Sequence, residues 1–400
     1  MRALAGTLLF LLIGAGAAFG VDPVPARAAS QEIRVLLEEN PSHGTISAEG
    51  GLWIMLPDGS YLPASRLELA PGSLVVDGTG RLELTEDLTV APLQGLVTWN
   101  GRPYRGTLCL VRGDQGLSLI NRVELEDYVR GVVPCELLSS SLEAVKAQAV
   151  LARTYALAQS RPGRSYDLTD TTRHQAYEGA AREHPDSDRA VLETEGEVLA
   201  YEGRLARHVV YHSTCGGLTE ANEHAFQGAP VPYLRATLCG RAFEDPPFCS
   251  RSSYATWAGR RALSRVEQDL APLFGNRRPS VQAIRISSRS DSGRVLTVAV
   301  ETDEGVLEFG GEQLRSVLKI EDEHRRERFL WSTWFEIQTV DDGAGPVLLV
   351  AGRGWGHGVG MCQWGAMEMA RQGAGYRQIL SHYYRGTELA AWNELSGREK

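Results

Sequence analysis

The chain has 400 residues, of which 43% are hydrophobic and 23% charged, and its formal net charge is −9. This composition is that of an ordinary globular protein, and the length suffices for two domains or for one large elaborated domain. A net negative charge argues against a nucleic acid as partner, so we expect none.

The N-terminus predicts a secretory signal peptide over residues 1–29. Arg2 precedes an apolar run at 8–18, with cleavage expected after Ala29 or, alternatively, after Gly20. This run is too short to cross a membrane, and no later apolar run reaches about 18 residues. We therefore expect a secreted, extracytoplasmic protein without a transmembrane segment.

Residues 30–119 predict a β-rich region. Short runs such as EIRVLLEE, LWIML and RLELT alternate with the turn sequences PDG at 57–59, DGTG at 77–80 and NG at 100–101. The region carries no catalytic constellation, so we expect it to support the remainder of the chain.

A long helix is predicted from Ser141 to the Pro-Gly pair at 162–163. Ser140 and Glu143 form a capping-box signature, S-x-x-E. Apolar residues then recur at helical spacing over about five turns, at Leu142, Val145, Ala149, Ala152 and Ala156.

Glu136 precedes this helix in the apolar segment GVVPCELL, and the nearest cation along the chain is Arg130. Loss of hydration raises the pKa of a carboxyl group from about 4.3, and a general acid at neutral pH needs a value near about 6 to 7. Glu136 is therefore a candidate proton donor. The alternative is a carboxylate that caps the next helix or pairs with Arg130 or Arg153.

Two further segments gather polar side chains. TDTTRHQAYEG at 169–179 offers a carboxylate, an imidazole, an amide and an aromatic ring, which together suit sugar recognition, or else a hydrogen-bonded loop that ties the core together. RHVVYHSTCGGLTE at 207–220 predicts a strand with His212 and Ser213 at its end, a common place for site residues.

Six cysteines are present, and secretion makes disulfides the first expectation. Their spacing lacks the CxxC pattern, so the sequence alone indicates zinc only weakly. The cysteines are Cys109, Cys135, Cys215, Cys239, Cys249 and Cys362.

Residues 255–345 predict an α+β insert with a helix at 257–270, a hairpin that turns at 291–293 and a short helix at 310–318. The charged stretch 321–328 is expected to be a solvated loop.

The glycines at 352, 354, 356, 358 and 360 would share one face of an extended strand, so that a backbone or a flat ligand could approach closely. No register gives GxGxxG, which argues against a nucleotide site. Short helices are expected at 363–373, beginning with Gln363, and at 376–384.

These motifs, in this order, resemble the stage II sporulation protein D and amidase-enhancer family (SpoIID/LytB). The resemblance rests on LEDYVRGVVPCEL with EAVKAQAVLARTYAL, TDTTRHQAYEG, YHSTCGGLTE and GRGWGHGVGMCQWGAMEMARQG, and covers roughly residues 120–388. It implies an α+β fold: the β-rich region at 30–119, a mixed domain at 120–390 with a long central helix and the insert at 255–345, and a tail at 391–400.

Some members of this family are peptidoglycan lytic transglycosylases with one essential Glu in the motif GVVPxE, which is Glu136 here. The resemblance thus implies a secreted enzyme of cell-wall remodelling or sporulation that cleaves glycan strands, forms 1,6-anhydro-muramic ends and needs no cofactor for the chemistry. Two rivals are a non-catalytic enhancer of a cell-wall amidase and a peptidoglycan-binding module.

The motif positions imply a substrate-binding set around Glu136: Arg153, Tyr155, Asp170, His174, Gln175, Tyr177, His212, Ser213, His357 and Gln363. Some relatives are similar in carrying a structural zinc beside the active site. The ligands here would be Cys215, Cys239, Cys249 and Cys362, with two disulfides as the alternative.

Overall fold

The computed structural model describes residues 31–113, 116–137, 139–160, 163–226, 228–343 and 345–395. The signal peptide predicted at 1–29 lies outside these ranges. From Glu32 onward the chain forms one compact unit with mixed helices and sheets, which confirms the predicted α+β class. No helix among the described residues is long and apolar enough to cross a membrane.

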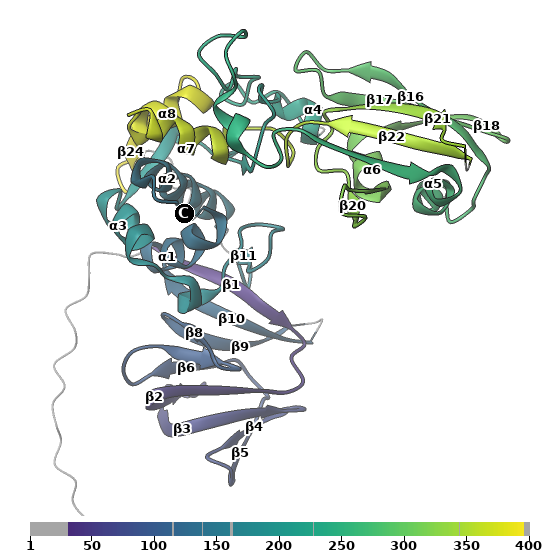
Figure 1. Ribbon diagram of the computed structural model, residues 1–400. Coiled ribbons are helices and arrows are strands. Elements are labelled where there is room, and N and C mark those ends of the chain that lie inside the picture. The colour runs from purple at the N-terminus through teal and green to yellow at the C-terminus, as the bar shows by residue number, and fades with distance from the viewer. Residues whose placement is uncertain are drawn as a thin grey trace, which may run out of the picture. The chain divides into compact units, whose positions relative to one another are not determined.

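The first part of this unit is a large, mainly antiparallel sheet (Figure 1) in the order β11–β1–β10–β9–β6–β2–β3–β4–β5, with β7 beside β2 and β8 beside β7. Its strands before the first helix are β1 (Glu32–Glu39), β2 (Gly44–Met55), β3 (Tyr61–Ala70), β4 (Ser73–Val76), β5 (Gly80–Glu83), β6 (Leu88–Pro92), β7 (Val97–Trp99), β8 (Arg102–Tyr104), β9 (Thr107–Gly113) and β10 (Gly116–Glu124).

Alternating apolar residues form these strands. Ile33 and Val35 in β1, and Leu52 and Ile54 in β2, are completely buried on the inward face, because successive side chains of a strand point to opposite sides. β1 also pairs in parallel with β11 (Leu168–Thr169), which holds the start of the 169–179 segment against the sheet.

Three helices follow: α1 (Leu125–Glu136), α2 (Leu142–Gln159) and α3 (Pro185–Glu193). α2 packs against α1 and α3 on one side and against α7 (Gln363–Arg371) and α8 (Tyr376–Tyr383) on the other (Figure 1). Twelve of its eighteen residues are buried, as expected of a helix with apolar contacts all round. This is the predicted central helix.

The predicted capping box does not form. The N-cap residue is Ser141, and its side chain makes no capping hydrogen bond. Glu143 instead receives a hydrogen bond from Lys146 and one from the backbone N–H of Tyr376 at the start of α8. The carboxylate thereby joins two helices rather than closing the end of one.

Short strands complete the central part. β12 pairs with β13 and β24, and β14 pairs with β23. The tail predicted from 391 begins at the last residue of β24. Their bounds are β12 (Glu197–Tyr201), β13 (Arg204–Leu205), β14 (Tyr211–His212), β23 (Met361–Cys362) and β24 (Glu388–Ala391); the remaining helical turns are α4 (Asn222–Phe226), η1 (Gly179–Arg182) and η2 (Phe248–Arg251).

The insert has its own apolar core, between two sheets in the orders β20–β19–β15–β22–β21 and β16–β17–β18. Its elements are β15 (Trp257–Ala262), α5 (Leu263–Leu270), η3 (Ala271–Phe274), β16 (Val281–Arg289), β17 (Val295–Thr302), β18 (Gly305–Gly310), α6 (Gly311–Val317), β19 (Lys319–Glu321), β20 (Glu327–Phe329), β21 (Phe335–Asp341) and β22 (Pro346–Gly352).

One prediction for the insert was wrong. Residues 257–262 form the central strand β15 rather than the first half of a helix, because pairing with β22 along its whole length outweighs local preference. The charged stretch 321–328 is mostly exposed, as expected of a solvated loop, and its residues 322–326 form the turn between β19 and β20. The turn at 291–293 and the helix near 310–318 are confirmed.

The extended strand predicted for the glycine motif was also wrong. β22 ends at Gly352, and Gly354, Gly356, Gly358 and Gly360 all have positive φ angles, between 71° and 104°. A side chain at Gly360 would lie 2.0 Å from the carbonyl oxygen of Val210. The four glycines therefore lie in a loop that packs closely against other segments. Their positive φ angles and the lack of space for a Cβ atom both favour glycine.

Candidate functional site

Glu136 is the last residue of α1 and is half-buried. Its Oε1 accepts a hydrogen bond of 2.8 Å from the backbone N–H of Ala176. Burial raises the pKa of this carboxyl, against the opposing effect of hydrogen bonds from Ala176 and Tyr211. Within the described residues no ion pair involves Glu136, so no neighbouring cation offsets the effect of burial on this pKa, and the half-buried carboxyl still reaches solvent.

A chain of hydrogen bonds orients this carboxyl. The Tyr128 hydroxyl donates to Gln175 Oε1 at 3.1 Å, and Gln175 Nε2 donates to the Tyr211 hydroxyl at 3.1 Å. The Tyr211 hydroxyl in turn lies beside Glu136, where its interaction with the carboxyl lowers the pKa that burial raises. Burial keeps the pKa of both tyrosines well above 10, so each hydroxyl remains a donor. We call Tyr128, Gln175, Tyr211 and Glu136 the acid relay.

Sequence reasoning missed Tyr128 and Tyr211. Each stands inside a motif already identified, Tyr128 in LEDYV and Tyr211 in YHSTC. Tyr211 directly precedes the candidate residue His212, whereas Tyr128 meets its partner Gln175 only in the folded chain. Tyr155, which had been predicted, is half-buried: burial raises the pKa of its hydroxyl, and the nearby Glu136 charge raises it further.

Gln363 joins the last motif to the first. Its Nε2 donates to the backbone carbonyl of Glu136 at 3.0 Å and to Gln148 Oε1 at 3.3 Å. The nitrogen of this amide therefore holds the end of α1 in place, where the sequence had suggested that it faces a ligand.

His212 and His357 lie together behind the relay, with ring centroids 5.5 Å apart. Because His357 Nδ1 accepts from the N–H of Val359, its Nε2 carries the proton and donates to the carbonyl of Tyr211 at 3.1 Å. Burial lowers the pKa of His357 to about 4 and that of His212 well below 6.5, so both rings are neutral at pH 7. They support the backbone of Tyr211.

The other residues predicted to bind substrate serve different contacts. Tyr177 is 2% exposed and donates to Asn121 at 2.7 Å. His174 Nδ1 bonds to Thr169, which closes the 169–179 loop on itself. Asp170 is half-buried with a pKa raised by burial, and the hydroxyl of Ser213 bonds to its neighbour Thr214.

Arg153 is completely buried. Nε and Nη2 donate to the Glu126 carboxylate at 2.8 and 2.7 Å, and Nη1 donates to the carbonyl of Glu197 at 2.8 Å. Each of its three nitrogens is thus engaged inside the protein, so the predicted contact with substrate is corrected to a structural role.

Arg153→Ala is expected to lower the free energy of unfolding by about 3 kcal/mol, because it leaves the Glu126 carboxylate without its partner. This value is the low end of the range of about 3 to 5 kcal/mol for breaking a buried pair, because water can still reach the Glu126 side chain, which is 25% exposed. Urea denaturation measures it, with Arg189→Ala as control, because the exposed pair Arg189–Glu193 contributes at most about 1 kcal/mol. Unchanged stability with weaker substrate binding would contradict the structural role.

Four cysteines converge beside the relay. The Sγ atoms of Cys215, Cys239, Cys249 and Cys362 all lie within 4.8 Å of one another, and all four residues are buried. All six cysteines of the chain lie in the described ranges and are free thiols. Cys109 is buried elsewhere and Cys135 is partly exposed.

This four-cysteine cluster fits a tetrahedral metal. With Zn–S distances of about 2.3 Å, sulfurs at tetrahedral corners lie about 3.8 Å apart; Cys215 and Cys249 are already 3.6 Å apart. Backbone N–H groups donate to the sulfurs, from Cys215 and Gly365 to Cys362 Sγ and from Gly217 to Cys215 Sγ. Such donors stabilise thiolates, so the cluster suits a structural zinc ion with no open coordination position.

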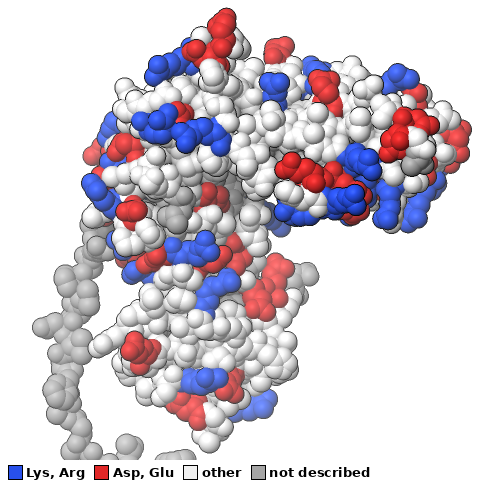
Figure 2. Space-filling view, viewed as in Figure 1, with Lys and Arg blue, Asp and Glu red and all other residues white. Residues whose placement is uncertain are grey.

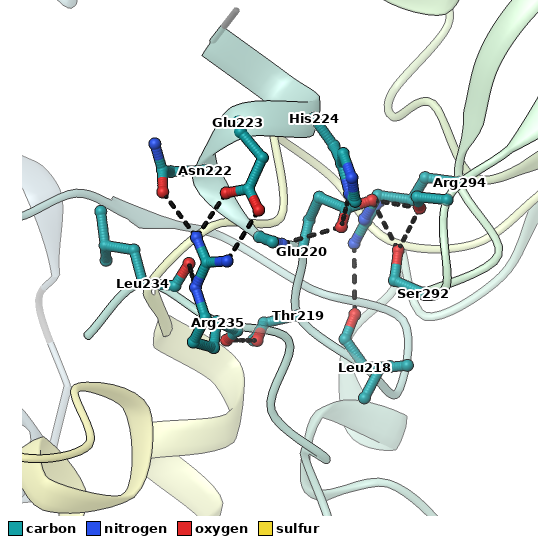
Figure 3. Close-up of polar contacts among 12 residues, drawn as sticks. Leu218, Thr219, Glu220, Asn222, Glu223, His224, Leu234, Arg235, Ser292 and Arg294 are labelled. Atoms are coloured by element: carbon teal, nitrogen blue, oxygen red, sulfur yellow. Dashed lines mark hydrogen bonds and ion pairs between the residues drawn. The ribbon is translucent and has the colours of Figure 1, made fainter. Parts of the chain in front are cut away.

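The insert is anchored directly to this region (Figure 3). Glu220 is 2% exposed, and its carboxylate accepts hydrogen bonds from Ser290 and, at 2.7 Å, from Ser292 of the insert. Arg294, 1% exposed, donates through Nη2 to the carbonyl of Cys215 at 2.7 Å. Burial of a charge is costly, and Arg294 Nε and Nη1 are buried without a hydrogen-bond partner among the described residues. The Nη2 contact and the two serine contacts therefore fix the insert to the cysteine segment.

Comparisons with known proteins agree with this arrangement. Residues 113–201 match the family described as stage II sporulation protein (SpoIID), and residues 249–360 match a domain of unknown function (DUF8618). An uncharacterized protein of Brachyspira hyodysenteriae is 31% identical over 306 residues, which are 75% of this chain and 75% of the relative.

Two further relatives have names. The amidase enhancer of Bacillus subtilis is 30% identical over 66% of this chain and 40% of its own length. Stage II sporulation protein D of Bacillus amyloliquefaciens is 27% identical over 68% of this chain and 75% of its own length. The fold and the matched segments thus define a sporulation-related class of cell-wall proteins. The chain belongs to the stage II sporulation protein D family.

Proposed function

We propose that this protein is a secreted lytic transglycosylase that cleaves the glycan strands of peptidoglycan, with Glu136 as its acid. The observation that carries the proposal is the state of this carboxyl: it is half-buried, its pKa is raised by burial, and the acid relay holds it in one orientation. A general acid near neutral pH needs these properties.

In the proposed reaction the Glu136 carboxyl gives its proton to the glycosidic oxygen as the bond from that oxygen to C1 of muramic acid breaks. The resulting carboxylate takes the proton of the C6 hydroxyl as the C6 oxygen bonds to C1. The products are a 1,6-anhydro end and a new hydroxyl end, and no water is consumed. The Tyr211 hydroxyl donates to the carboxylate between the two steps.

Hydrolysis is supported less well. Hydrolases commonly place two carboxyl groups on either side of the scissile bond. Among the described residues, the pKa of Glu136 shows no influence of a second carboxylate. One group that first donates and then accepts a proton is sufficient for the lytic reaction.

The direct test is to incubate the purified protein with glycan strands stripped of their peptides and to examine the products by mass spectrometry. Anhydro-muramic ends are the expected result. Reducing ends that carry the mass of one added water would show hydrolysis instead.

The cleavage rate is expected to fall as the pH rises through the pKa of Glu136, because the reaction begins with the protonated acid. The folded-state pKa is raised, so the stability that Glu136 contributes is present at low pH and is lost as the pH rises through that pKa. Initial rates of the wild type test the first effect, and melting temperatures of the wild type and Glu136→Gln test the second. Both are measured across about pH 4 to 8, a range that begins near the ordinary carboxyl pKa and extends above neutrality. A difference in melting temperature that does not change with pH would contradict the raised pKa.

A second candidate function is enhancement of a cell-wall amidase, favoured by the relative that bears that name. In that case the protein would accelerate peptide removal by an amidase without making anhydro ends. Assaying the amidase reaction alone and with added protein separates the two functions.

A further inference from the structure

The insert contains a cavity of about 840 Å³ that is lined only by residues between Ser253 and Arg353. It lies where β15, β21 and β22 end, and the turn of the hairpin β19–β20 forms one wall. Its volume falls within the range of about 300 to 1,000 Å³ that is usual for small-molecule sites. None of the acid-relay residues lines it.

Aromatic rings dominate the wall of this cavity. Trp331 lies 5.4 Å from Trp257 and 6.0 Å from Tyr254, measured between ring centroids. Trp257 Nε1 donates to the carbonyl of Gly354 at 2.9 Å, which fixes the innermost ring. Trp331 and Trp334 are half-buried, so their remaining surface faces the cavity. Rigid rings of this kind bind a ligand at a low cost in conformational entropy.

The rim carries charged groups of both signs. The side chains of Glu323 and Glu336 are 86% and 78% exposed, and that of His324 is 63% exposed. The Arg353 guanidinium lies 4.9 Å from the Trp334 ring. Acidic and basic side chains are likewise mixed over the visible surface of the insert (Figure 2), so the rim is not a patch of one charge.

This combination fits a sugar better than other ligands. The C–H face of a sugar ring is apolar with a partial positive charge, which matches the negative face of an indole ring. Its hydroxyl and acetamide groups need both acceptors and donors at the edge, which Glu323, Glu336 and Arg353 offer. Glu336 is paired with Arg289 at 2.7 Å, and Glu323 lies 3.6 Å from His324. A lipid tail would remove water from these exposed charges, and phosphate groups would meet the two carboxylates.

The cavity is also joined to the glycine loop of the catalytic segment. The N–H of Gly356 donates to the carbonyl of Trp331 at 2.9 Å, and the N–H of Gly354 donates to that of Tyr254 at 2.9 Å. The same loop continues to His357 and Gln363, which hold Tyr211 and Glu136. We propose that this cavity is a saccharide-binding site that holds a glycan strand apart from the acid relay. Only the identity of the glycan as peptidoglycan rests on the proposed function.

The test measures binding of N-acetylglucosamine tetramers, and of peptide-free glycan strands, to the full-length Glu136→Gln protein by calorimetry and tryptophan fluorescence. Trp331→Ala is expected to weaken binding about twofold to tenfold, the range that loss of one aromatic stacking contact produces. Trp53→Ala, which removes an indole 37% exposed on β2, is the matched control and should bind as the parent does.

A second variant guards against misfolding of Trp331→Ala. Glu323→Gln combined with Glu336→Gln changes only exposed side chains and should also weaken binding. Unchanged binding by both variants would overturn the proposal, and so would binding of the free stem peptide in place of the sugar. Loss of binding in both variants together with absence of cleavage by wild type would reject the proposed enzyme and keep the saccharide site.

Discussion

Glu136→Gln is expected to slow glycan cleavage by a factor of about a hundred to ten thousand, the usual contribution of a general acid. The amide keeps the shape of the side chain and still accepts the hydrogen bond from the Ala176 N–H, so folding should persist. It cannot give up the proton that the glycosidic oxygen needs. Mass spectrometry of anhydro ends over time gives the rate.

Glu143→Gln is the control for this variant. Glu143 lies in the first turn of α2 and bonds to Lys146 and to the N–H of Tyr376 rather than to the relay. Its replacement should leave cleavage near the wild-type rate. Cleavage by Glu136→Gln at the rate of this control would remove Glu136 as the acid, and retained stimulation of an amidase by Glu136→Gln would favour the enhancer.

Loss of the metal is expected to have the largest effect on stability. Purified protein should hold one zinc ion per chain, and Cys249→Ser or a strong chelator should lower the melting temperature sharply. In zinc-finger peptides metal binding contributes about 10 to 16 kcal/mol, which is comparable with the whole free energy of unfolding of most domains, about 5 to 15 kcal/mol. Metal analysis and thermal unfolding measure both results.

Cys109→Ser is the matched control, because Cys109 is equally buried but lies outside the four-cysteine cluster. It should change neither the zinc content nor the response to a chelator. Metal-free protein in which four cysteines fail to react with a thiol reagent after denaturation would instead indicate two disulfides.

Local periodicity and turn sequences were sufficient to predict α2 and the hairpin of β16 and β17, because in both cases neighbouring residues decide the structure. They failed for β15, whose pairing partner β22 lies about ninety residues further along the chain. Local periodicity failed again for the glycine motif. Close contact with Val210 and His212 determines the conformation there, rather than the alternation of residues.

The candidate site shows the same division. Glu136 could be selected from its apolar neighbours, since desolvation is a local property. The roles of Tyr211 and Gln363 depend on contacts across about 75 and 227 residues of sequence, which no spacing reveals. Convergence of the cysteines is likewise a property of the fold alone, because they come from four separate segments.

The segment matched as a separate domain begins at Cys249, so its boundary passes through the four-cysteine cluster. That boundary assigns one of the four sulfurs to the insert and three to the surrounding chain. Arg294 crosses the boundary in the other direction. Exchange of residues 249–360 for an unrelated module would leave three of the four cysteines, and a buried carboxylate at Glu220 without its serine donors. Insert and core are therefore structurally complementary, and neither can be replaced alone without loss of these contacts.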